Sequence, residues 1–110
     1  MVTTIQQTTL PPGYTGPSPI KCLQAAGLNQ ARPGVEPQVW EGNFGSSAET
    51  DSNAIVFLSG PYQNETVATD YAESLQSVEL ASSGGLWVAS ASVRSQLKYQ
   101  VDSVATCMAH

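Results

Sequence analysis

The sequence predicts one α+β domain built as a two-layer sandwich, in which an antiparallel sheet carries helices on one face. Three observations predict this class. The 110 residues are 41% apolar, which is enough for a single modest core. Short runs of β-branched and aromatic residues alternate with segments of helical period. The closing segment, residues 92–110, spaces its apolar residues by three and four positions, as an amphipathic helix does.

The first 17 residues differ in composition from the rest. They hold three prolines, five threonines and no charged residue, and they show no helical or strand period. Such a segment is typical of an extended arm or tether, so the folded domain is expected over residues 18–110. The alternative is an ordered arm that lies on the domain surface through Ile5, Leu10 and Tyr14.

Residues 18–27 predict a short helix. Ser18 is a suitable N-cap, Pro19 suits the first turn, and Gly27 can end the helix in a left-handed conformation. One apolar face is formed by Ile20, Leu23 and Ala26. The segment after it, "NQARPGVEP", is expected to be a loop. The next segments, "QVWEGNF" and "AIVFLSG", predict two strands joined by a long turn, "GSSAETDSN".

A second helix is expected within residues 60–80, because apolar residues recur there at helical spacing. The predicted stripe is Val67, Tyr71, Leu75 and Val78, with Ala68 and Ala72 beside it. The stretch "ASSGG" ends it, and "LWVASAS" predicts a third strand. The closing helix follows, with Ser92 as its expected N-cap.

The expected order is therefore helix, strand, strand, helix, strand, helix. This is the order of a ferredoxin-like sandwich that lacks its first strand. Either the arm supplies that strand, or the sheet stays three-stranded and the last helix covers it.

The two cysteines lie at opposite ends of the domain, each in a predicted helix. If both helices lie on the same sheet face, Cys22 and Cys107 can form a disulfide that closes a long loop. Such a bond contributes roughly 4–5 kcal/mol and is typical of oxidising compartments. The alternative is two reduced, buried thiols. A metal site is not expected, since two thiols and His110 fall short of four ligands.

Nine acidic against four basic residues give a net charge of −5, which disfavours nucleic acids and anionic membranes as partners. No apolar run is long enough for a membrane span. Charged residues are only 12% of the chain, and such neutral, hydroxyl-rich surfaces are commoner in exported proteins. We expect an extracytoplasmic protein, secreted or membrane-anchored, whose leader would precede residue 1.

No catalytic or cofactor signature is evident. His110 is the last residue, and no serine has a neighbouring histidine to activate it. The acidic residues of the second helix read as a solvated face. We therefore expect no cofactor and no enzymatic activity.

The candidate binding surface is aromatic. If Val39 and Leu86 face the helices, then Trp40 and Trp87 lie together on the open face of the sheet, with Tyr62 near them. The alternative is that the two tryptophans form the core.

Residues 54–91 resemble the second half of a sporulation-related repeat (SPOR) domain. The resemblance lies in "AIVFLSGPYQNETVATDYAESL" followed by "GGLWVASAS". It implies a ferredoxin-like fold that binds bacterial cell-wall glycan on its sheet face. The ends "CLQAAGL" and "VATCMA" resemble cysteine-bearing helices of uncharacterised exported actinobacterial proteins.

The expected function is thus a non-enzymatic extracytoplasmic module that binds a protein or glycan partner or associates with itself. One alternative is a small dimeric α/β-barrel enzyme, in which two sheets enclose an apolar pocket. Another is a structural or assembly domain of a surface or virion protein.

Overall fold

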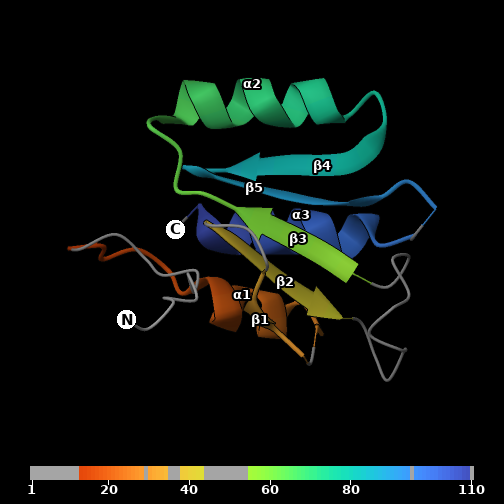
Figure 1. The fold of residues 1–110 in the computed structure, drawn as a ribbon, viewed down its shortest axis with the longest axis horizontal. Coiled ribbons are helices and arrows are strands. Elements are labelled where there is room, and N and C mark those ends of the chain that lie inside the picture. The colour runs from red at the N-terminus through yellow and green to blue at the C-terminus, as the bar shows by residue number, and fades with distance from the viewer. Residues whose placement is uncertain (1–12, 29, 35–37, 44–54, 95, 110) are drawn as a thin grey trace, which may run out of the picture.

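The computed structural model describes residues 13–28, 30–34, 38–43, 55–94 and 96–109 (Figure 1). These residues form three helices, α1 (Pro19–Ala25), α2 (Glu65–Leu75) and α3 (Lys98–Met108). They also form five strands, β1 (Arg32–Pro33), β2 (Val39–Asn43), β3 (Ile55–Ser59), β4 (Glu79–Gly84) and β5 (Trp87–Ser92). The predicted α+β class is confirmed.

The five strands make one sheet in the order β1-β2-β3-β5-β4, and every neighbouring pair is antiparallel. Because β5 lies between β3 and β4, those two strands run in the same direction. Helix α2 connects them and crosses over β5 (Figure 1). The strand that comes last in the chain is therefore the one that joins the two parts of the sheet.

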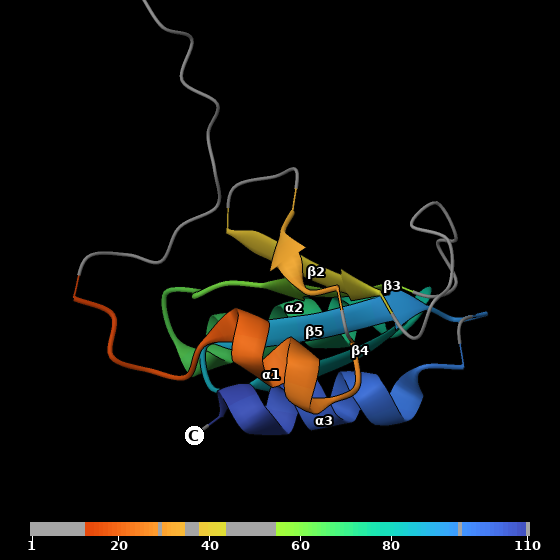
Figure 2. The same ribbon diagram turned by 90° about the horizontal axis from the view of Figure 1, so that it is seen from below.

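Helices cover both faces of the sheet, which corrects the expectation of helices on one face. Figure 2 shows α1 and α3 on one side of β5 and α2 on the other. In β5, Trp87, Ala89 and Ala91 pack into the core under α1 and α3, whereas Val88 packs under α2. A strand that is apolar at successive positions needs cover on both faces. The successive apolar residues of β5 in "LWVASAS" therefore indicated that both of its faces are covered.

Two strands were not predicted. Strand β1 lies within the segment expected to be a loop, and β4 lies where the second helix was expected to end. Helix α2 stops at Leu75, and Val78 is 64% exposed after it instead of completing the predicted stripe. Strand β4 packs tightly under α3, since a Cβ at Gly84 would overlap the carbonyl oxygen of Ala105.

The helix ends follow the predicted chemistry only in part. Ser18 caps α1 as expected, because its hydroxyl accepts a hydrogen bond from the Lys21 backbone N–H at 3.3 Å. Ser92 does not cap α3. It is the last residue of β5, and α3 begins five residues later than predicted, with Leu97 at its N-cap position.

The disulfide is confirmed. Cys22 of α1 and Cys107 of α3 are bonded, with their Cα atoms 5.7 Å apart. The bond lies at the edge of the main core, where Leu23, Val101 and Val104 are fully buried. The crosslink therefore holds α1 against α3 on one face of the sheet.

Part of the predicted arm is ordered on the domain. Tyr14 packs against the main core, its ring 6.0 Å from that of Trp87, and its hydroxyl donates to the Pro17 carbonyl at 2.6 Å. Burial raises the pKa of the Tyr14 phenol. Ile5 and Leu10 lie outside the described residues.

Candidate functional site

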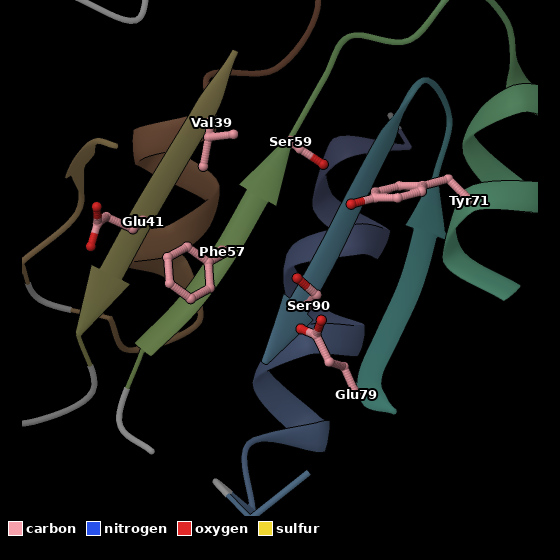
Figure 3. Close-up of a pocket in the computed structure, with 7 residues that line it drawn as sticks. All are labelled: Val39, Glu41, Phe57, Ser59, Tyr71, Glu79 and Ser90. Atoms are coloured by element: carbon pink, nitrogen blue, oxygen red, sulfur yellow. The ribbon is translucent and has the colours of Figure 1, made fainter. Parts of the chain in front are cut away.

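Among the described residues, helix cover on one face of the sheet is confined to β4 and β5. Helix α2 packs on β4 and β5, so the side chains of β2 and β3 on the same face lie beside the helix and not beneath it. The strand register places Glu41 opposite Phe57, and Phe57 opposite Ser90. These side chains form a row across the sheet (Figure 3).

This face of the sheet contains a cleft of about 350 Å³, within the range that ligand sites occupy. It is lined by Val39, Glu41, Phe57, Ser59, Tyr71, Glu79 and Ser90. Four strands and one helix contribute to it, so the lining residues are held by regular structure. We call it the sheet cleft.

Aromatic rings form the centre and one wall of the sheet cleft. Phe57 rises from the middle of β3 and is 38% exposed, and Tyr71 reaches over the sheet from α2 and is 42% exposed. Exposed rings held this way are a surface that a ligand can cover.

Tyr62 supports that wall from behind. Its ring lies 5.6 Å from the ring of Tyr71, and its hydroxyl forms a 2.7 Å hydrogen bond with that of Ser59. Burial raises the pKa of Tyr62. This predicted site residue therefore positions two members of the sheet cleft.

The two carboxylates of the sheet cleft have different surroundings. Glu41 forms an ion pair with Arg32 at 3.0 Å and turns toward β1. Glu79 extends from β4 toward β5, and its carboxylate ends beside Ser90 (Figure 3). In the described part of the chain, ion pairs are formed by Arg32 with Glu41 and by Lys98 with Asp102, so Glu79 has no cationic partner there.

The predicted tryptophan surface is wrong. Trp40 is 4% exposed and Trp87 is 1% exposed, and their rings pack 5.3 Å apart in the core beneath α1 and α3. The alternating pattern was assigned to the wrong faces: Val39 lies in the sheet cleft and Trp40 faces the helices. A shift of one position exchanges the two faces of a strand.

Sequence reasoning proposed none of the seven residues that line the sheet cleft as site residues, and Tyr62 is the one predicted site residue that contacts them. Phe57 lies in the apolar run "AIVFLSG", for which the sequence predicts a strand but gives no clear alternation between its two faces. The available signal was the alternation of side chains along a strand: Ser59 lies two residues after Phe57 and is therefore on the same face of the sheet. That hydroxyl marked this face as the less apolar one.

The hydroxyl–carboxylate cluster of α3 and β4 is structural. Ser82 donates a hydrogen bond to Asp102, which also pairs with Lys98 at 3.1 Å. The hydrogen bond from Ser82 lowers the pKa of Asp102, against the opposing effect of burial. A carboxylate with a lowered pKa is a weak base and does not activate a serine. The cluster ties α3 to β4.

The described residues contain no group of three or more His, Cys, Asp and Glu side chains that could hold a metal ion. Within the same residues, no helix is long and apolar enough to cross a membrane. Comparisons with protein-family models, curated proteins and solved structures found no match.

Proposed function

We propose that this chain is a non-enzymatic, extracytoplasmic binding module and that the sheet cleft is its ligand site. The observation that carries the proposal is the pair of exposed rings, Phe57 and Tyr71, held over a rigid sheet beside hydroxyl and carboxylate groups. Burying an exposed aromatic side chain is among the strongest single contributions to recognition.

The extracytoplasmic location is supported by the Cys22–Cys107 disulfide, because structural disulfides persist in oxidising compartments. The Pro- and Thr-rich residues 1–17 then serve as a tether, secreted with the domain or joined to an anchor. This role is compatible with Tyr14, which docks the end of that segment onto the domain.

Binding is favoured over catalysis by the chemistry of the sheet cleft. Its polar groups are three hydroxyls and two carboxylates, and one carboxylate is already neutralised by Arg32. The dimeric-barrel enzyme is less favoured, since that arrangement needs one whole sheet face open and helices here lie on both faces.

Protein and glycan partners are both compatible with this surface. The SPOR resemblance of residues 54–91 implies a glycan on the sheet face, and five of the seven lining residues fall within that range. Aromatic rings also bind peptide side chains, so the site alone does not require a sugar.

The site is tested by ¹H–¹⁵N NMR titrations of the folded protein with chitotetraose and with capped tetrapeptides. Ligands should shift the signals of Phe57, Tyr71 and their neighbours. Phe57→Thr and Tyr71→Ala should weaken binding, while Tyr99→Ala, a control on the far side at α3 where the ring is 76% exposed, should not. Binding that persists in both cleft variants, or shifts confined to other surfaces, would show the assignment to be wrong.

A further inference from the structure

The polarity of the sheet cleft is one-sided. Hydroxyls of Ser59, Ser90 and Tyr71 and carboxylates of Glu41 and Glu79 supply its polar atoms, and none of its described lining residues is basic. Every polar group there can accept a hydrogen bond, and no lining cation can attract an anion. The whole chain carries a net charge of −5, which adds to this preference.

Among the described residues, Glu79 is the carboxylate of the sheet cleft that forms no ion pair. Its carboxylate lies beside Ser90 (Figure 3). Lys98, which lines a second hollow with Glu79 at the β4 edge, forms its ion pair with Asp102 instead. Arg32 is engaged by Glu41. A ligand that covers Glu79 and brings its own positive charge is therefore favoured over a neutral one, because covering a carboxylate without a counter-charge is unfavourable.

We propose that the sheet cleft binds a basic side chain, lysine or arginine, of a protein partner. This inference rests on the proposed function and adds the class of ligand. Glu79 accepts the ion pair, while Phe57 and Tyr71 contact the aliphatic stem and the charged tip.

The shape of a basic side chain matches the distribution of groups in the sheet cleft. Lysine and arginine combine an apolar stem with a charged end. Val39 and Phe57 form an apolar floor over β2 and β3, and the Glu79 carboxylate lies to one side of it. The exposed aromatic faces also attract a cation through their quadrupole. A neutral sugar would satisfy the rings but leave the carboxylate without a counter-charge.

Because the sheet cleft is open to solvent, its ligand can be one side chain of a partner protein. Phe57 and Tyr71 are partly exposed at the mouth of the sheet cleft, so a partner's main chain can stay outside while one side chain enters. A volume of about 350 Å³ accommodates one such side chain and part of its neighbours.

The test compares two variants that lose the same charge. Glu79→Gln removes the carboxylate of the sheet cleft, and Glu73→Gln removes an exposed carboxylate on α2 that does not line it. Capped tetralysine and capped tetraarginine are titrated into each protein by NMR and calorimetry. We expect signals of Phe57, Tyr71 and Glu79 to shift in the wild type. Glu79→Gln should raise the dissociation constant about fivefold and Glu73→Gln less than twofold.

Four results would overturn the inference. Equal weakening by Glu79→Gln and Glu73→Gln would mean that net charge alone holds the peptides. Spermidine binding as tightly as the peptides would assign the site to a free polyamine. Shifts in the sheet cleft with chitotetraose but not with the basic peptides would leave the binding function intact and exclude a cationic ligand. If no probe perturbs the sheet cleft, the proposed function fails as well.

Discussion

Removing the disulfide should cost a large share of the stability of this domain. The crosslink joins residues 85 positions apart. The entropy of a closed loop of that length in the unfolded chain corresponds to about 4.5 kcal/mol at 25 °C. Small domains are stable by roughly 5–15 kcal/mol, so the loss brings the folded state close to its limit.

The assay is urea unfolding of the oxidised wild type and of the double variant Cys22→Ala/Cys107→Ala, with tryptophan fluorescence as the probe. Trp40 and Trp87 lie in the core and report its loss. With a urea dependence of about 2 kcal/mol per molar, the midpoint should fall by about 2 M. Each single alanine variant should match the double one, because either change removes the crosslink. A loss below about 1 kcal/mol would refute the loop-entropy reasoning.

Three further predictions concern the fold. Gly84→Ala places a methyl group against the Ala105 carbonyl oxygen and should destabilise the domain by about 3 kcal/mol, measured by urea unfolding; an unchanged midpoint would mean that α3 moves away freely. Trp87→Ala should cost about 3–5 kcal/mol in the same assay, and a loss under 1 kcal/mol would contradict its place in the core. Asp102 has a pKa lowered chiefly by the hydrogen bond from Ser82, so its contribution to stability is present above the unfolded pKa of about 4 and is lost as pH falls through the folded pKa. Thermal unfolding between pH 5 and pH 2 should therefore show a smaller acid destabilisation in Asp102→Asn than in the wild type, and parallel curves would exclude this role.

Local chemistry carried most of the correct predictions. Ser18 and Pro19 define the start of α1 through groups within one turn, and the pairing of Cys22 with Cys107 follows once both lie in helices on one sheet face. Such signals depend on neighbouring residues, which the sequence shows directly.

The wrong predictions concern features that depend on residues far apart in the sequence. β4 begins inside the predicted helical segment and continues into the "ASSGG" stretch that was expected to end it, and its strand is packed by β5, α2 and α3, which are non-local partners. The faces of β2 depend on which helices lie above and below, and a strand's alternation alone does not distinguish the two. The sheet cleft was missed for the same reason, since it exists only because α2 covers half of a face.

A single strand separates the sheet cleft from the crosslinked core. In β5, Ser90 contributes to the sheet cleft while Ala89 and Ala91 are fully buried on the side of α1 and α3. Ligand binding to the sheet cleft and the redox state of the two cysteines are therefore linked through folding. A molecule that binds only the folded chain shifts the folding equilibrium toward the folded state, whether or not the disulfide is formed. A partner held at saturating concentration should thus offset part of what reduction removes, and keep Cys22 and Cys107 close enough to reoxidise.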